Sequence, residues 1–275
     1  MTSRHATRIA AAKAANFFAA RVHNIQTLAT GVKRIDLTVQ PPTANNPTPF
    51  AFLPGQWVDY YIESIDQVTG YSMISSPLDL PHLSLVVQYS SLNAAAVHVH
   101  ENTHVHDLVW LRNGGQVTWD AASPTEKNHA LMLAGGIGVT PYASMLRHLQ
   151  KSKRTMAMAT EDNTSKAASV SVRRCALLHS STNNVLANDL EAMSKELPEH
   201  IRYQHSLTNG SGLGRINKKD IDSALAFLKR NEEEEEECGT VPMLCGTAPF
   251  VSDMTFVLTH DFDFQEEDIL VEKWW

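Results

Sequence analysis

The chain has 275 residues, 43% of them hydrophobic, and a formal net charge of −7 at neutral pH. This length allows one large domain or two of ordinary size, each with a buried core. Six of the negative charges belong to the single run 232–237, which is typical of a solvated loop, and without that run the chain is close to neutral. Its overall charge therefore does not indicate nucleic acid or an acidic membrane as a partner.

The three cysteines, Cys175, Cys238 and Cys245, are odd in number and not closely spaced. This pattern argues against a disulfide framework and against a zinc ribbon, and it favours a reducing compartment. No apolar run has the length that a membrane span requires.

The amino-terminal segment is rich in alanine and basic residues, and the first acidic residue is Asp36. This composition resembles a mitochondrial targeting segment. Because the pattern from Ala19 onward already indicates a strand, only residues 1–16 are a candidate leader. Mitochondrial and cytoplasmic locations both stay open, with the mitochondrial one favoured.

Residues 17–123 are predicted to form a first domain of antiparallel strands, either a barrel or a sandwich. Short runs rich in β-branched and aromatic residues alternate with turn-forming clusters that contain proline, glycine and asparagine. The predicted strands include 32–39, 57–62, 83–89 and 108–111, and 94–102 is predicted as a short helix.

Residues 124–275 are predicted to form an α/β domain, because apolar runs alternate there with helical patterns. Such alternation indicates a Rossmann-like parallel sheet with helices on both faces. Two stretches, 151–172 and 231–239, lack periodicity and are predicted insertions. The predicted strands are 130–134, 175–179, 201–206 and 241–244, and the predicted helices are 141–150, 185–196, 218–230 and 250–260.

The most informative motif is the glycine-rich stretch 135–141, Gly-Gly-Ile-Gly-Val-Thr-Pro, which joins the first of these strands to the first helix. Gly135, Gly136 and Gly138 let the backbone approach a ligand closely, Thr140 is a candidate helix cap, and Pro141 suits a first helical turn. A strand, a glycine turn and a helix start together aim backbone N–H groups at an anion. The motif therefore predicts a phosphate-bearing cofactor, with an ordinary turn as the alternative.

Two further motifs have the chemistry of cofactor sites. Cys245 and Gly246 again follow a strand and precede a helix, and a compact sulfur beside a glycine can lie against a flat ring, although a buried structural cysteine is the alternative. In the first domain, Tyr71 can stack on a conjugated ring and Ser72 can hydrogen-bond a ring nitrogen. An ordinary strand with a serine-rich end is the alternative for that pair.

In this order the motifs resemble the ferredoxin–NADP reductase superfamily, in which a flavin-binding barrel precedes a nicotinamide-binding domain. The matching positions are Pro54-Gly55-Gln56, Tyr71-Ser72, residues 135–141 and Cys245-Gly246-Thr247-Ala248-Pro249. The resemblance implies that Tyr71 and Ser72 contact FAD and that the glycine loop with Thr140 and Pro141 holds the dinucleotide. It also implies that Cys245 and Gly246 lie beside the nicotinamide.

The ending Val-Glu-Lys-Trp-Trp extends this resemblance. Superfamily members often end with a glutamate shortly before an aromatic residue that covers the flavin, and Glu272 and Trp274 match that spacing. The ending is similar to the branch called oxidoreductase NAD-binding domain-containing proteins. By resemblance Ser72, Cys245 and Glu272 shape the hydride-transfer site and Trp274 shields the flavin, whereas anchoring in the core is the alternative for the tryptophans.

The chain departs from the superfamily at the flavin diphosphate. Thr69 stands where an arginine is usual, and Asn93 and Ala96 stand where glycine and serine of a phosphate loop are expected. Losing a charge-assisted contact of about 1.5–3 kcal/mol weakens binding by an order of magnitude or more. His98 and His100 are candidate replacement donors, and together with His104 and His106 they leave a metal site open as an alternative, although the spacing matches no zinc signature.

The resemblance predicts an NAD(P)H-dependent flavin oxidoreductase that passes hydride from nicotinamide to FAD and electrons onward to an acceptor, for which a redox protein is one candidate. Ser180 falls where NADP-preferring members have a serine, but Thr182 replaces the arginine expected two residues later, which favours NAD, although Arg215 could restore some preference for NADP. The rival hypothesis is a non-catalytic nucleotide-sensing or interaction module that has lost flavin binding. A metal-dependent enzyme is a third.

Overall fold

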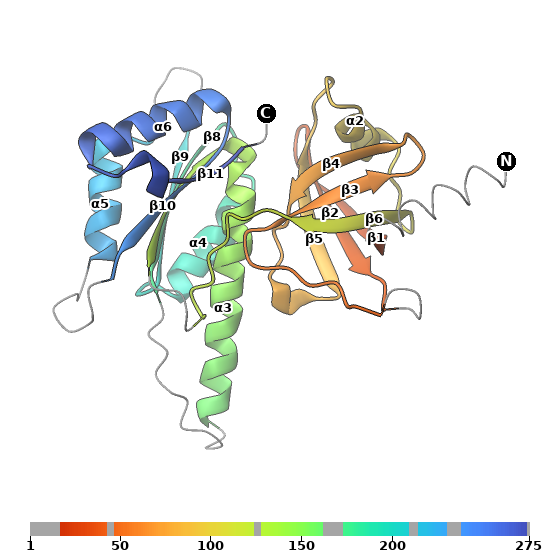
Figure 1. Ribbon diagram of the computed structural model, residues 1–275, viewed down its shortest axis with the longest axis horizontal. Coiled ribbons are helices and arrows are strands. Elements are labelled where there is room, and N and C mark those ends of the chain that lie inside the picture. The colour runs from red at the N-terminus through yellow and green to blue at the C-terminus, as the bar shows by residue number, and fades with distance from the viewer. Residues whose placement is uncertain are drawn as a thin grey trace. The chain divides into compact units, whose positions relative to one another are not determined.

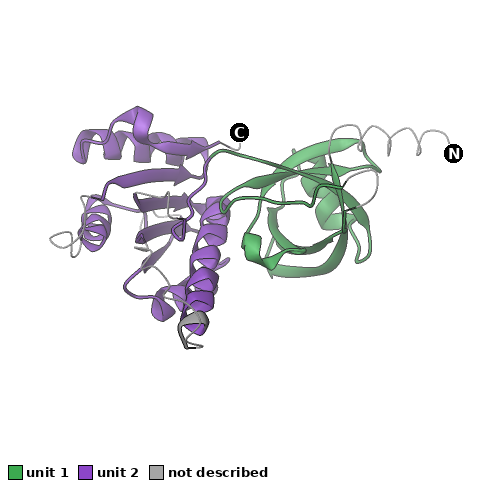
Figure 2. Ribbon diagram, turned by 60° about the horizontal axis from the view of Figure 1, so that its bottom comes forward, with its two compact units in different colours: residues 1–116 green, residues 117–275 purple. Residues whose placement is uncertain are grey.

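The computed structural model describes residues 17–42, 47–123, 128–161, 173–208, 214–229 and 238–273. The candidate leader 1–16, most of the two predicted insertions (162–172 and 231–237) and Trp274 lie outside these residues, so the expectations for them stay predictions. The chain divides into two compact units, unit 1 at residues 1–116 and unit 2 at residues 117–275 (Figure 2).

Unit 1 contains a six-stranded antiparallel sheet in the order β4-β3-β6-β1-β2-β5. An isolated bridge between Met73, just after β4, and Leu85 of β5 joins the two edges of the sheet, so it curls into a barrel. The elements are β1 (Phe18–Ala29), β2 (Val32–Val39), β3 (Trp57–Ile62), β4 (Gln67–Ser72), the 3-10 turn η1 (Pro77–Asp79), β5 (His82–Gln88), α2 (Ala94–Glu101) and β6 (Leu108–Gly114).

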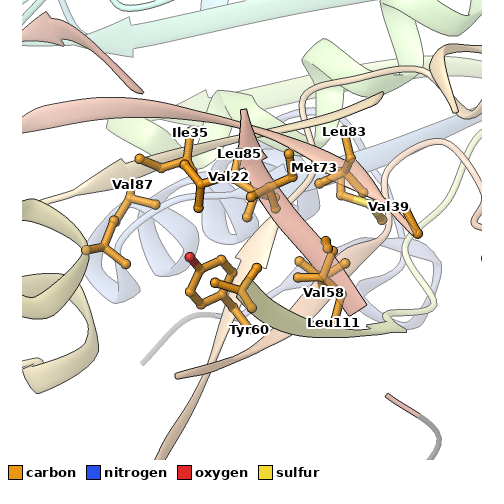
Figure 3. Packing of buried hydrophobic residues seen from close by; sticks show 14 of the residues in the cluster. Val22, Ile35, Val39, Val58, Tyr60, Met73, Leu83, Leu85, Val87 and Leu111 are labelled. Atoms are coloured by element: carbon orange, nitrogen blue, oxygen red, sulfur yellow. The ribbon is translucent and has the colours of Figure 1, made fainter. Parts of the chain in front are cut away.

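Alternation of apolar and polar residues along the strands fills the barrel interior. In β2, Ile35, Leu37 and Val39 occur at every second position and are buried, as one face of a strand should be. Figure 3 shows Ile35 and Val39 in one cluster with Tyr60 and Leu83 from other strands. The strands are therefore held by a shared core rather than by local preference alone.

Unit 2 contains a five-stranded parallel sheet in the order β11-β10-β7-β8-β9. Its strands are β7 (His129–Gly135), β8 (Cys175–Ser181), β9 (Ile201–Leu207), β10 (Thr240–Cys245) and β11 (Leu270–Glu272). The helical elements are the 3-10 turn η2 (Gly136–Val139), α3 (Thr140–Glu161), α4 (Ala187–Glu196), α5 (Lys218–Leu228), α6 (Ala248–Asp261) and the 3-10 turn η3 (Glu266–Asp268). The predicted fold class, an antiparallel barrel followed by a Rossmann-like domain, is confirmed.

Helices cover both faces of the parallel sheet, which explains why its strands are almost continuously apolar. Leu131 and Leu133 of β7 and Leu178 of β8 pack against α5 and α6 in one cluster. Figure 1 shows α3 and α4 over the opposite face. The faces alternate residue by residue, so His179 lies on the α3 and α4 side, next to Leu178 on the other.

The first helix of unit 2 is longer than the predicted 141–150, because α3 continues to Glu161. The lysines, arginine, methionines and alanines beyond Gln150 are good helix formers. Arg154 also donates two hydrogen bonds of 2.6 Å to the Glu196 carboxylate at the end of α4, which ties the extension to its neighbour. The predicted insertion 151–172 therefore begins inside a helix. Over the described residues, no helix combines the length and the apolar character needed to cross a membrane.

We expect Leu133→Ala to lower the unfolding free energy of unit 2 by about 2–5 kcal/mol, because Leu133 is fully buried in the sheet. The matched control is Leu207→Ala, whose side chain is 54% exposed and whose loss should change stability by no more than about 0.5 kcal/mol. Urea unfolding followed by circular dichroism measures both, and equal effects would contradict the packing described.

Candidate functional site

The glycine loop joins β7 to α3 through the 3-10 turn η2, at the carboxyl edge of the parallel sheet. Gly136 is exposed and has φ +58°, a left-handed conformation that favours glycine. Gly135 precedes the turn and has no side chain to accept hydrogen bonds from the first N–H groups of η2. These groups also lack acceptors within their own turn, which is an arrangement that can bind an anion.

The structure corrects the predicted role of Thr140. Its backbone is already helical, with φ −60° and ψ −47°, and its hydroxyl donates to the Ile137 carbonyl at 3.0 Å instead of capping an N-terminus. Pro141 lies in the first turn of α3, as predicted. The helical turn begins at Gly136, five residues before the predicted start at 141, which places the open N–H groups within the glycine-rich stretch itself.

The glycine loop is in direct backbone contact with the turn between β10 and α6, residues 245–247, which we call the Cys245 loop. The two loops meet because β7 and β10 are neighbours and Ala134 pairs with Cys245. A Cβ atom on Gly138 would collide with the Cys245 carbonyl. A Cβ atom on Gly246 would come within 3.1 Å of the Gly135 Cα atom. Glycine at these positions is therefore required for the two loops to form one surface.

Cys245 and Glu272 lie together beside this surface, because β10 and β11 pair in parallel register at these two residues. Both are buried, Cys245 fully. The fully buried Tyr142, in the first turn of α3, lies close to both residues. Burial raises the pKa of Tyr142 well above its usual value, and the nearby Cys245 and Glu272 raise it further. The spacing of Tyr142 with Met145 and Leu149 matches the buried stripe of a helix, so the sequence by itself indicates a core residue there.

Ser180 is the penultimate residue of β8 and pairs with Gly135 of β7. Its hydroxyl donates to the Gly214 carbonyl at 3.1 Å, next to Arg215. The hydroxyl is thus held by the chain itself, on the sheet face away from His179. Its predicted part in dinucleotide binding stays a prediction.

A buried histidine that sequence reasoning missed lies beneath the glycine loop. The His179 Nε2 atom is 2.9 Å from the Gly136 carbonyl oxygen, and its Nδ1 atom is 3.1 Å from the Tyr203 hydroxyl. The side chain is 1% exposed. Burial lowers the pKa of His179 to about 4, with a smaller contribution from His205 in the same direction, and the Gly136 bond opposes the shift.

In unit 1, the predicted flavin-contacting pair lies at the end of β4. Tyr71 is half-buried and packs edge-on against Tyr60, with ring centroids 5.8 Å apart. Burial raises the pKa of Tyr71 to about 12. Ser72 is buried, and in the preceding turn Gln56 donates to the Gly115 carbonyl at 3.0 Å and accepts from the Leu53 N–H at 2.8 Å.

The expected diphosphate end of a flavin site does not fit FAD well. The Asn93 side chain accepts hydrogen bonds from the N–H groups of Ala95 and Ala96, at 3.0 and 3.1 Å, so it caps α2 itself. Those donors are not open to a phosphate. Thr69, which pairs with Tyr60 on β3, supplies no positive charge at its position.

The four histidines of the alternative metal reading do not form one cluster. His98 is 3.4 Å from the Ser64 hydroxyl, and the His100 ring is 3.0 Å from the Val87 carbonyl. His104 faces Asp107, with the two polar atoms 3.9 Å apart. Within the described ranges, no group of three or more histidine, cysteine or acidic side chains could hold a metal ion.

The low pKa of His179 predicts a loss of stability in acid. The pKa of a histidine in the unfolded chain is near 6.5. Between pH 6.5 and about 4, the unfolded chain therefore binds a proton at this residue and the folded chain does not. The stabilising contribution is complete above pH 6.5 and is lost as the pH falls toward 4. Between pH 7 and pH 5 the wild type should lose about 2 kcal/mol more unfolding free energy than His179→Gln, which does not titrate. Urea unfolding at the two pH values measures the difference, and parallel losses would refute the assignment.

The described geometry agrees with the similarities of this chain to known proteins. Residues 132–255 match the family model described as oxidoreductase NAD-binding domain. Oxidoreductase NAD-binding domain-containing protein 1 of Danio rerio is 27% identical over 272 residues, which cover 94% of this chain and 92% of that protein.

Three solved structures share the fold at low sequence identity. Phthalate dioxygenase reductase, described as transferring electrons from pyridine nucleotides to [2Fe-2S], is 14% identical with a TM-score of 0.67, covering 95% of this chain and 69% of that one. The cytochrome b5 reductase domain of Ulva prolifera nitrate reductase is 16% identical with a TM-score of 0.67, covering 94% and 98%. The FAD/NAD binding domain of nitric oxide dioxygenase from Vibrio cholerae is 15% identical with a TM-score of 0.64, covering 93% and 97%. The resemblance inferred from the motifs is therefore confirmed: residues 132–255 match an oxidoreductase NAD-binding domain, and the chain has the two-domain fold of the reductase structures to which it is similar.

Proposed function

We propose that this protein is an NAD(P)H-dependent oxidoreductase in which unit 2 binds the nicotinamide dinucleotide, with NAD preferred over NADP. The observation that carries the proposal is the contact between the glycine loop and the Cys245 loop, which only glycine at position 138 allows. The open N–H groups of η2 suit the diphosphate, and the buried cluster of Cys245, Glu272 and Tyr142 lies at the same edge of the sheet, where a nicotinamide ring would bind.

The chain's own residues contribute geometry and exclusion of water. When bound, a reduced nicotinamide supplies the hydride. Cys245 presents a compact sulfur at the end of β10, and Glu272 is fixed beside it by strand pairing. The preference for NAD rests on Thr182, which carries no charge where a cation would pair with an extra phosphate.

A flavin acceptor is proposed from the family, since the Vibrio cholerae neighbour is described as an FAD/NAD binding domain. Unit 1 offers Tyr71 and Ser72 for its ring, but Thr69 and the capped α2 offer little for its diphosphate. We therefore propose that flavin binds weakly and exchanges, rather than staying as a resident group. The second candidate, a nucleotide-binding module without flavin, is favoured by the same Asn93 cap.

The substitution Gly138→Ala should weaken NADH binding by about tenfold or more, because the added methyl group must push the two loops apart. The matched control is Gly239→Ala at the opposite end of β10, where an added Cβ atom meets only the Asn128 side chain. Fluorescence titration with NADH measures the dissociation constants. If the two variants bind NADH equally well, the glycine loop is not the dinucleotide site.

Flavin retention is tested with two flavins that differ in their phosphates. Wild-type protein should bind FAD and riboflavin with dissociation constants within about tenfold of each other, because few donors meet the diphosphate. Thr69→Arg should then tighten FAD by about tenfold or more and leave riboflavin unchanged, whereas the neutral control Thr69→Gln should tighten neither.

Binding of both flavins, followed by bleaching of the flavin absorbance with NADH, supports the oxidoreductase. If neither flavin binds the wild type or Thr69→Arg while NADH still binds, the nucleotide-binding module is the correct function.

A further inference from the structure

We propose that His179, oriented by Tyr203, is a positioning residue that holds the Gly136 peptide of the glycine loop in the orientation that the dinucleotide diphosphate requires. This inference rests on the proposed function of unit 2. Its starting point is the pair of hydrogen bonds that His179 makes, one to the Gly136 carbonyl at 2.9 Å and one to the Tyr203 hydroxyl at 3.1 Å.

The directions of these two bonds follow from chemistry. A carbonyl oxygen only accepts, so the His179 Nε2 atom carries the proton and donates it to Gly136. The Nδ1 atom of a neutral ring then has a lone pair, so the Tyr203 hydroxyl donates to it. The low pKa of His179 keeps the ring neutral at physiological pH, and the two bonds together select one tautomer.

Holding one carbonyl also fixes the N–H group across the same peptide. In a planar trans peptide the two point in opposite directions. With the Gly136 carbonyl directed at His179, the Ile137 N–H points away from β8, toward the open side of the loop. This N–H is one of the donors of η2 without an acceptor in its own turn.

Gly136 is the residue at which such a restraint is needed. It is exposed, no atom would contact a Cβ there within 4 Å, and glycine adopts positive and negative φ with similar ease. No packing therefore prevents this peptide from turning over. The His179 bond supplies the preference for one orientation.

A second layer of contacts holds the His179 ring itself. His205 of β9 packs against it, with ring centroids 4.8 Å apart and ring planes tilted by 31°. The Ser181 hydroxyl donates to the Asn183 carbonyl at 2.6 Å, so it accepts from the His205 Nε2 atom at 2.8 Å. All three rings come from alternate positions on β8 and β9, on the sheet face that α3 and α4 cover. The cluster is built into the sheet, and His179 links it to the loop through the bond to Gly136.

The experiment compares His179→Leu, which removes the donor, with His179→Gln, whose amide can still donate to the Gly136 carbonyl. The ligands are NADH and ADP-ribose, which share the diphosphate but not the nicotinamide. We expect His179→Leu to weaken both ligands by about tenfold and His179→Gln by less than about threefold. In ¹⁵N-labelled protein without ligand, the Ile137 amide signal should shift or broaden in His179→Leu and stay near its wild-type position in His179→Gln.

Tyr203→Phe keeps the ring and removes only the hydroxyl, so it tests the inference even if His179→Leu does not fold. It should weaken both ligands, and histidine ring NMR of the wild type should show the proton on Nε2 of His179. Unchanged affinity for both ligands in Tyr203→Phe and in every folded His179 variant overturns the inference, as does a proton on Nδ1. If wild-type protein binds neither ligand, it is the proposed function that fails, and the ring NMR and the Ile137 amide then decide separately whether His179 holds the loop.

Discussion

The contact between the glycine loop and the Cys245 carbonyl is the constraint on which the rest of unit 2 depends. Parallel pairing of β7 with β10 brings the ends of both strands to the same edge, and Gly138 lets the two following turns touch. Because the turns touch, the open N–H groups of η2 lie beside the buried thiol. The order of the strands thus determines that the glycine turn and Cys245 are neighbours.

The N-terminus of α2 in unit 1 and the start of η2 in unit 2 differ in whether a side chain accepts hydrogen bonds from the first backbone N–H groups. In unit 1, Asn93 accepts from the N–H groups at the start of α2, and the chain needs no ligand there. In unit 2, Gly135 occupies the same position before η2, and it has no side chain that could accept a hydrogen bond from the first N–H groups of the turn. The same physical requirement, a partner for each backbone donor, is met by a side chain at α2 and is not met by one at η2. This contrast favours dinucleotide binding over tight FAD binding.

The fold and the main loops of the site could be predicted from sequence because they depend on local pattern. Apolar runs and helical spacing located β7 to β10 and the helices between them, and glycines after a strand located the loop. The missed features depend on pairing across the sheet. Nothing near His179 in sequence indicates Tyr203 or His205, which become neighbours only through the register of β8 with β9. The end of α3 was misplaced for a related reason, since Glu196, 42 positions away, anchors it.

Tyr142 shows why a residue type can mislead at such a site. Its spacing with Met145 and Leu149 matches a buried helical stripe, and the ring is indeed fully buried. Its hydroxyl, however, lies near Cys245 and Glu272, and burial with these two groups keeps it protonated. A phenol that keeps its proton there adds a neutral hydroxyl to a buried cluster that already holds a carboxyl and a thiol. The cluster therefore gains no further negative charge beside the two loops.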